Sequence, residues 1–536
     1  MSKKIEIFDS TLRDGAQARG INYSLSDKLQ MLFLLDSLGF DYIEAGNPAS
    51  NPKERQFFEE AEKVKLSHAK LVAFGSTRRK NTDVKSDAGV AALMEAKTQA
   101  VAVFGKAWDL HATEVLGTTL DENLSMIYDT LKLLKDSGRE VIFDAEHYYD
   151  GYKANPGYAL EVLKTACRAG AESIVLCDTN GGAMQHEFEE ATKAALQVID
   201  KKLGVHVHND TELAVASTIL GVRLGACHVQ GTLLGYGERC GNARLSSIIP
   251  NLQLKMGYDC IGGNIKKLYA VCREAAEITN LAFDETLPYV GRNAFAHKGG
   301  MHIDGLCKAE GSFEHTDPSA VGNSREFLLS EVAGRSALTE KLKTEFPDLA
   351  ADKARVSKMM ETLKELESEG YSFEGAESSF KLFVLKQLGL HKQRFSLVHF
   401  KVSDEPTHEN SFGAYAVVKV HVDGQTRMAA AEGNGPVNAL DKALREALGS
   451  FFPALLGVTL TDYKVRVLNT DAATAAKVRV VIESSNGSGF WRTMGVSTDV
   501  IEASLFALID SIDHLLLENG ANEKSRPAWH TPFSNY

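Results

Sequence analysis

Residues 4 to about 257 alternate between short apolar runs and stretches with helical periodicity. The apolar runs predict eight strands, each followed by a helix candidate such as 26–39 or 121–138. Alternating strands and helices are typical of a parallel sheet. Eight such units in roughly 250 residues fit a closed barrel better than an open doubly wound sheet, which stays as the structural alternative. We therefore predict an α/β fold that begins with a (β/α)8 TIM barrel.

The pattern changes twice after the barrel. A charged and mainly helical stretch predicts linker subdomains, and a stretch with hairpin patterns predicts a C-terminal α+β domain. The last residues have the composition of a tail. The predicted divisions are 1–264 for the barrel, 265–390 for the helical linker subdomains, 391–520 for the α+β domain and 521–536 for the tail.

The α+β domain contains two similar segments. One hairpin is predicted over 414–433, with its turn at Asp423-Gly424, and a second over 477–497. A helix opening follows each hairpin, and the two openings carry apolar residues at matching offsets. These residues are Val437, Ala439, Ala443 and Leu444 in the first opening, and Ile501, Ala503, Ala507 and Leu508 in the second. The matching offsets indicate an internal duplication.

Composition excludes several classes of protein. The net charge of -12 disfavours a nucleic-acid binder. The seven cysteines include no CxxC pair, so neither a zinc knuckle nor a disulfide framework is indicated. The chain has no apolar signal region and no run of about 18 apolar residues, so we expect no membrane partner and a cytoplasmic location.

Polar side chains gather where the predicted strands end. In a closed barrel, the carboxyl ends of the strands form the face on which active sites are built. The residues at these positions are Asp9, Glu44, Ser76, Lys106, Glu146, Asp178, Thr179, His206, His208 and Gly237. We therefore expect an enzyme with its site on this face.

Two histidines on the seventh strand predict a metal site. His206 and His208 are two residues apart, so their side chains share one face of the strand, while Val205 and Val207 face the helices. A pair of structural strand-end histidines is the alternative. Barrel closure makes strands one, seven and eight neighbours, which brings Asp14 and Asn242 toward the histidines. Two imidazoles, a carboxylate and an amide oxygen suit Mg²⁺, Mn²⁺, Zn²⁺ or Co²⁺.

Two long motifs carry a family resemblance. "DSTLRDGAQ" and "GVHVHNDTELAVASTILGVRLGACHVQGTLLGYGERCGNARL" resemble the patterns of the 2-isopropylmalate, homocitrate and citramalate synthases of the DRE-TIM metallolyase superfamily. "AEGNGPVNALDKAL" and "GVSTDVIEASLFALIDSI" resemble the C-terminal regulatory domain of this family. The resemblance implies a catalytic barrel, a regulatory and dimerisation domain at 391–520, a homodimer, and an amino-acid effector such as isoleucine.

Within the family, four segments are most similar to the longer citramalate synthases. They are "AFGSTRR", "VFGKAWD", "DAEHYYDGYKANPGYAL" and "VLCDTNGG". The likeness implies an acyltransferase that joins acetyl-CoA to pyruvate and releases (R)-citramalate and CoA, the first step of a threonine-independent isoleucine route. 2-Isopropylmalate synthase and homocitrate synthase stay as alternatives, because they differ in the acceptor side chain. Acyl-CoA lyases and an inactive metabolite sensor are further alternatives.

The resemblance also implies roles for residues around the acceptor. Arg13 is a permanent planar cation, so it can hold the oxygens of a 2-oxo acid without competing as a base. Thr179 resembles the family residue that hydrogen-bonds the substrate carboxylate. Glu44 falls at the third letter of the superfamily name and is assigned to the substrate site. Independently of the resemblance, the charged run Ser76–Lys80 is expected either to contact the CoA phosphates or to be a solvated surface segment.

Removing a methyl proton from acetyl-CoA requires a positioned base. By resemblance, His302 is this base and Glu146 assists it; Asp304, close to His302, is a further catalytic candidate. Phe313 stands where many relatives carry tyrosine, and a phenyl ring donates no hydrogen bond.

Overall fold

The computed structural model describes residues 3–328, 352–373, 375–406, 412–468, 475–487 and 489–520, together with isolated positions between 338 and 350. The predicted tail, 521–536, lies outside the described residues. The chain divides into two compact units. The first comprises Met1–Ala296 and Glu314–Glu326, and the second His297–Phe313 and Phe327–Tyr536.

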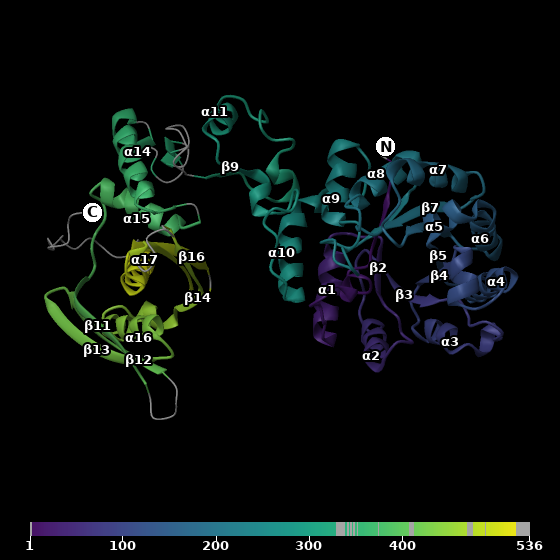
Figure 1. Ribbon diagram of the computed structural model, residues 1–536, viewed down its shortest axis with the longest axis horizontal. Coiled ribbons are helices and arrows are strands. Elements are labelled where there is room, and N and C mark those ends of the chain that lie inside the picture. Colours follow the sequence, from purple (N-terminus) through teal and green to yellow (C-terminus); the bar gives the residue numbers. More distant parts are fainter. Residues whose placement is uncertain are drawn as a thin grey trace. The chain divides into compact units, whose positions relative to one another are not determined.

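The first unit contains a closed barrel of parallel strands, which confirms the predicted fold (Figure 1). Each strand pairs with the next, and β8 pairs with β1 to close the barrel. The strands are β1 (Glu6–Asp9), β2 (Tyr42–Gly46), β3 (Lys70–Ser76), β4 (Ala100–Lys106), β5 (Glu140–Glu146), β6 (Ser173–Asp178), β7 (Lys202–Val207) and β8 (His228–Gly231). Most of their residues are buried, as expected for strands covered on both faces.

Helices surround these strands. They are α1 (Leu25–Ser37), α2 (Pro52–Ala61), α3 (Ala88–Glu95), α4 (Leu120–Asp136), α5 (Tyr148–Ala154), α6 (Pro156–Ala169), α7 (Gln185–Leu196), α8 (Ala214–Leu224), α9 (Leu245–Pro250) and α10 (Leu268–Thr279). Side-chain caps fix several helix starts. Ser24 and Asp27 form a capping box on α1, and Thr119 accepts from the Glu122 amide at the start of α4. Helices α1 and α4 confirm the predictions at 26–39 and 121–138 within two residues.

The barrel has an apolar lumen below its polar end. Phe8, Tyr42, Val175 and Cys177 belong to a buried cluster inside the strands, and a larger core fills the space between the strands and the helices. At the amino ends of the strands, His228 lies against Phe8 and Tyr42, with ring centroids 5.4 and 5.5 Å apart. This packed core leaves the carboxyl end of the barrel as the end at which polar groups meet.

The second unit begins with helices. They are α11 (Gly300–Lys308), α14 (Lys353–Ser368) and α15 (Glu377–Gln387). Ile303 from α11 shares one buried cluster with Met359 of α14 and Phe383 of α15. Short strands β9 (Ala296–His297) and β10 (Glu326–Phe327) lie where the chain passes between the units. No helix among the residues that the model describes is long and apolar enough to cross a membrane.

Two three-stranded antiparallel sheets, each followed by a helix, complete the second unit. The elements are β11 (Ser396–Pro406), β12 (Phe412–Val422), β13 (Gln425–Gly433), α16 (Pro436–Gly449), β14 (Thr459–Val467), β15 (Val478–Ser485), β16 (Phe490–Ser497) and α17 (Val500–Gly520). The two predicted hairpins are confirmed as β12–β13 and β15–β16. Asp423 and Gly424 both have positive φ, as a tight hairpin turn requires. The same order of elements, found twice, agrees with the predicted duplication.

Candidate active site

Barrel closure brings the loops after β1, β7 and β8 together. Asp14 lies just after β1, His206 is within β7, and His208 follows β7. His208 forms an isolated bridge with Asn242, which lies after β8. Gly237 leaves room for this asparagine, because a Cβ there would lie 2.1 Å from Asn242 Nδ2. The structure therefore brings the four predicted metal ligands together.

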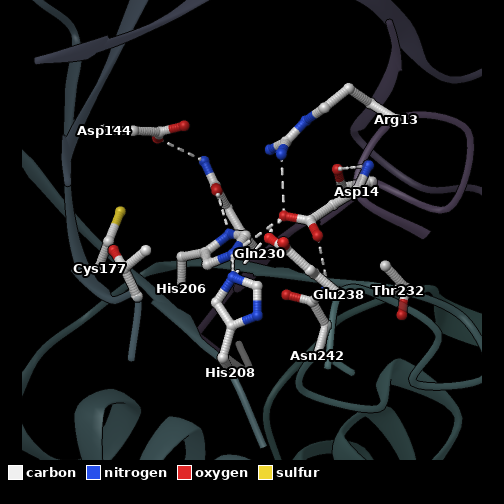
Figure 2. A network of polar contacts seen from close by, with 12 residues as sticks. Arg13, Asp14, Asp144, Cys177, His206, His208, Gln230, Thr232, Glu238 and Asn242 are labelled. Carbon is white, nitrogen blue, oxygen red and sulfur yellow. Dashed lines mark hydrogen bonds and ion pairs between the residues drawn. The ribbon is translucent and has the colours of Figure 1, made fainter. Parts of the chain in front are cut away.

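Their ligating atoms have the spacing of a metal site (Figure 2). His206 Nε2 lies 3.4 Å from His208 Nε2, and Asp14 Oδ2 lies 3.5 and 3.9 Å from these two nitrogens. Ligands about 2.1 Å from one ion are separated by about 3.0 Å in octahedral and about 3.4 Å in tetrahedral geometry. The observed spacing thus needs only small movements to hold a divalent ion.

Asn242 supplies a fourth group. Its Nδ2 donates to Asp14 Oδ1 at 2.9 Å, while its Oδ1 is buried and has no hydrogen-bond partner in the described structure. A buried oxygen without a partner is costly unless a ligand satisfies it. The unpaired Asn242 oxygen beside Asp14 and the two imidazoles therefore fits a metal ligand.

The ionisation of these groups suits a cation. Burial raises the pKa of the Asp14 carboxyl, but Arg13 and the two histidines outweigh it and hold that pKa well below its usual range. Burial, with His206 beside it, lowers the pKa of His208 to about 4. An ionised carboxylate and a neutral imidazole are the forms that bind metals.

Arg13 is held in place from two sides. Its Nη1 atom donates to Asp14 Oδ2 at 2.8 Å, and its Nε donates to Glu44 Oε2 at 2.7 Å. Ser10 Oγ donates to the same Glu44 oxygen at 2.5 Å, and the guanidinium lies 3.9 Å from the centre of the Phe74 ring. Glu44 is fully buried, so it acts through Arg13 and does not face an open surface.

Thr179 lies just after β6 and accepts a hydrogen bond at its hydroxyl oxygen from the His147 amide, at 2.9 Å. His147 has a φ of 58°, and its ring contacts Asp150 at 3.0 Å. Because the backbone amide occupies an acceptor position of the Thr179 oxygen, the hydroxyl proton stays available for another partner. Thr179 is thus oriented as a donor.

The loops after β6, β7 and β8 are joined by an arginine. Arg239 donates to both carboxylate oxygens of Asp210, at 2.8 and 2.9 Å. The Arg239 Nη2 atom also donates to the backbone oxygen of Thr179 at 2.7 Å. Bidentate arginine–carboxylate pairs fix geometry well. This pair therefore ties the loop that carries Asn242 to the segment that carries Thr179.

The predicted proton-transfer residues fall in both units. Glu146 ends β5 and forms an ion pair with Lys106, which ends β4. His302 and Asp304 lie on α11 in the second unit. There the His302 ring stacks on Phe313 with centroids 4.3 Å apart, and Asp304 pairs with Lys308 at 2.5 Å. The roles of these residues stay predictions.

Several residues at the carboxyl end of the barrel have contacts that the sequence did not predict. Lys106 was visible only as a strand-end polar residue. Gln230 on β8 accepts from His206 Nδ1 at 2.9 Å and donates to Asp144 on β5 at 3.0 Å. The signal for Gln230 was a polar residue inside an apolar strand run. Within Ser76–Lys80, Arg78 is buried in ion pairs with Glu122 and Asp129, so this arginine has a structural role.

Three family models match successive parts of the chain. Residues 4–272 match the HMGL-like family, which covers the barrel. Residues 289–371 match a homocitrate synthase post-HMGL domain-like model. Residues 374–516 match the LeuA allosteric (dimerisation) domain. The barrel, the helical region and the duplicated domain thus each have a counterpart in one enzyme superfamily.

Two curated relatives are similar along nearly the whole chain. The (R)-citramalate synthase of Aquifex aeolicus (strain VF5) is 48% identical, covering 97% of this chain and 99% of that protein. The enzyme of that name from Geobacter sulfurreducens is 46% identical, covering 97% and 99%. A crystal structure of the HMG-CoA lyase from Brucella melitensis is 18% identical with a TM-score of 0.44, covering 52% of this chain and 98% of that one. This chain belongs to the (R)-citramalate synthase family of the DRE-TIM metallolyase superfamily.

Proposed function

We propose that this protein condenses acetyl-CoA with pyruvate and releases (R)-citramalate and CoA. The observation that carries the proposal is the cluster of Arg13, Asp14, His206 and His208 at the carboxyl end of the barrel. Its support comes from full-length relatives named (R)-citramalate synthase that are 41–48% identical. The reaction forms a carbon–carbon bond between the acetyl methyl carbon and the keto carbon of pyruvate, and water then cleaves the thioester.

Asp14, His206, His208 and Asn242 would hold one divalent ion. Mixed nitrogen and oxygen ligands suit Mg²⁺, Mn²⁺, Zn²⁺ or Co²⁺. When bound, such an ion polarises the keto group of a chelating 2-oxo acid and stabilises negative charge on its oxygen. The buried and ionised Asp14 supplies the main attraction for the cation.

The protein's own groups orient the acceptor. Arg13 donates to the oxygens of pyruvate from a fixed position, because Glu44 and Asp14 hold two sides of its guanidinium. Thr179 donates a hydrogen bond from its hydroxyl group to the pyruvate carboxylate, since its hydroxyl oxygen already accepts one from the His147 amide. Fixed donors stabilise developing negative charge without reorganising during the reaction.

Proton transfer is assigned to three residues. His302 takes the methyl proton of acetyl-CoA, with Asp304 beside it on the same helix. Glu146 orients the water from the end of β5 by accepting a hydrogen bond from it, and the Lys106 ammonium group keeps the Glu146 carboxylate in place. These assignments rest on the family likeness together with the position of Glu146 on the catalytic face.

We also propose a homodimer that is inhibited by a branched-chain amino acid such as isoleucine. The match of residues 374–516 to a LeuA allosteric (dimerisation) domain supports this proposal. Light scattering of the purified protein tests the dimer. Calorimetric titration with isoleucine, with leucine as comparison, tests the effector. The cytoplasmic location stays a prediction.

The acceptor is tested by measuring CoA release with acetyl-CoA and each of three 2-oxo acids. We expect the highest kcat/KM with pyruvate, and (R)-citramalate as the product on chiral chromatography. A preference for 2-oxoisovalerate would assign the chain to 2-isopropylmalate synthesis, and a preference for 2-oxoglutarate to homocitrate synthesis. Either result would reject the proposed acceptor and leave the metal site standing.

A further inference from the structure

A chain of three buried side chains crosses the lumen beside the metal cluster (Figure 2). Asp144 on β5 accepts from Gln230 Nε2 at 3.0 Å, and Gln230 Oε1 lies 2.9 Å from His206 Nδ1. Strands β5 and β8 are not neighbours in the barrel. Gln230 therefore spans the lumen and connects Asp144 to a predicted metal ligand.

The direction of these hydrogen bonds decides which histidine nitrogen is protonated. An amide oxygen only accepts, so the Gln230 contact requires the proton of neutral His206 to be on Nδ1. Its Nε2 then carries a lone pair, and this is the atom that lies 3.4 Å from His208 Nε2 and 3.5 Å from Asp14. The tautomer set by Gln230 is the one that can ligate a metal.

The opposite orientation of the Gln230 amide would have the reverse effect. Its NH2 group would then face His206 Nδ1 and require the proton to be on Nε2, where it blocks ligation. In the structure Asp144 Oδ1 accepts from the NH2 group, which then points away from His206. Burial raises the pKa of Asp144 to about 8, and a carboxyl group accepts at an oxygen in both its ionised and its protonated form. Gln230 is fully buried, so water does not compete with Asp144 for the hydrogen bond from its NH2 group.

His208 differs from its neighbour. Its Nδ1 is buried and has no hydrogen-bond partner in the described part of the chain. His206 is thus the one of the two imidazoles whose tautomer the surrounding strands specify.

We propose that Gln230 and Asp144 are positioning residues that hold His206 in its Nδ1-protonated form and thereby strengthen divalent-metal binding at the Asp14 cluster. The inference rests on the proposed metal site of this enzyme. Asp144 acts through Gln230, because only Gln230 contacts His206 directly. Neither residue is assigned a contact with the substrate.

The test is the affinity of the chelator-treated full-length protein for Mn²⁺ alone, measured by isothermal titration calorimetry. Gln230→Leu removes the acceptor and should weaken binding about 10- to 100-fold, the usual effect of losing such a partner. Asp144→Leu should weaken it about 3- to 30-fold, and Asp144→Asn, which keeps an oxygen acceptor, should stay within about threefold of the parent. The double variant Gln230→Leu/Asp144→Leu should bind no more weakly than Gln230→Leu.

Cys177→Ala is the matched control. Cys177 is another buried side chain of the lumen, and among the described residues its thiol hydrogen-bonds only within its own strand, to Val175. Its loss should therefore lower the unfolding temperature without changing Mn²⁺ affinity. The inference would be overturned if Gln230→Leu bound Mn²⁺ as tightly as the parent. It would also be overturned if the double variant lost Mn²⁺ affinity by the product of the two single losses. If Gln230→Leu does not fold, the contrast between Asp144→Leu and Asp144→Asn decides, and equal affinities would overturn the inference. A parent protein that binds no Mn²⁺ would overturn the metal site itself and the inference with it.

Discussion

Replacing Glu44 by glutamine tests how far the acceptor site depends on a residue that faces no open surface. Glu44 Oε2 accepts from both Arg13 Nε and Ser10 Oγ, and the carboxylate is fully buried. The Glu44→Gln side chain keeps the shape and one acceptor oxygen, but loses the charge. The variant therefore separates the charge of Glu44 from its size.

The magnitude follows from the two hydrogen bonds. A hydrogen bond to a charged group contributes about 1.5–3 kcal/mol and a neutral one about 0.5–1.5 kcal/mol. Weaker anchoring of Arg13 by about 1–2 kcal/mol lowers kcat/KM for pyruvate by about 5- to 30-fold. Glu44 Oε1 is buried without a hydrogen-bond partner in the described structure, so the new NH2 group has no acceptor there and stability falls by about 1–3 kcal/mol.

The assay is steady-state CoA release with pyruvate as the varied substrate, together with thermal unfolding. Glu140→Gln is the matched control, because Glu140 accepts from Tyr42 and pairs with Lys70 at the amino end of the barrel. This control should lose stability and keep kcat/KM. Glu44→Gln with unchanged kcat/KM and lowered stability would refute the claim that Glu44 positions Arg13.

Four further results are expected. Burial raises the pKa of Glu6, but His228 and Lys202 outweigh burial and lower that pKa to about 2. The ionised Glu6 carboxylate therefore stabilises the folded protein above pH 4.5, and this contribution is lost as the pH falls toward 2. Glu6→Gln should therefore lower stability by roughly 1–2 kcal/mol at pH 7 and by less at pH 3, measured by thermal unfolding; an equal loss at both would contradict this. Thr179→Val should raise the KM for pyruvate about tenfold, while Thr179→Ser keeps the hydroxyl and stays near the parent; equal KM values in both variants would reject the hydroxyl contact. Arg239→Ala should lower kcat/KM about tenfold, because it frees the loop that carries Asn242. Arg239→Lys should restore kcat/KM only partly, because lysine makes no bidentate pair with Asp210. Full activity in Arg239→Ala would show that the Arg239 contacts with Asp210 and Thr179 do not support catalysis. Prolonged chelation should abolish CoA release and added Mn²⁺ should restore it; activity that survives complete metal removal would contradict the metal site.

The barrel was predictable because its strands are apolar runs that alternate with helices. Convergence of Asp14 with His206 followed from closure of the barrel, which makes strands far apart in the sequence adjacent. Strands β11 and β14 were missed, whereas β13 and β16, the other edge strands of the two sheets, were predicted because each belongs to a hairpin. In β14 the apolar residues Tyr463, Val465 and Val467 alternate with polar ones but are exposed, so the alternation does not mark a buried face.

The supporting contacts of the site were harder to predict. Gln230 reaches both Asp144 and His206 only because of the register between strands around the closed barrel, and a single sequence does not encode that register in a readable pattern. The His147 amide meets Thr179 through a left-handed backbone conformation at a residue other than glycine. Neither contact follows from residue type or spacing.

In the proposed mechanism the condensation depends on a metal ion that the Asp14 cluster binds. The most direct measurement compares metal content and pyruvate-dependent CoA release of the parent and of His206→Ala/His208→Ala, after circular dichroism has shown that both are folded. We predict one divalent ion per chain and turnover in the parent, with neither in the double variant. Turnover by a folded double variant would show that the condensation does not need a metal held by His206 and His208.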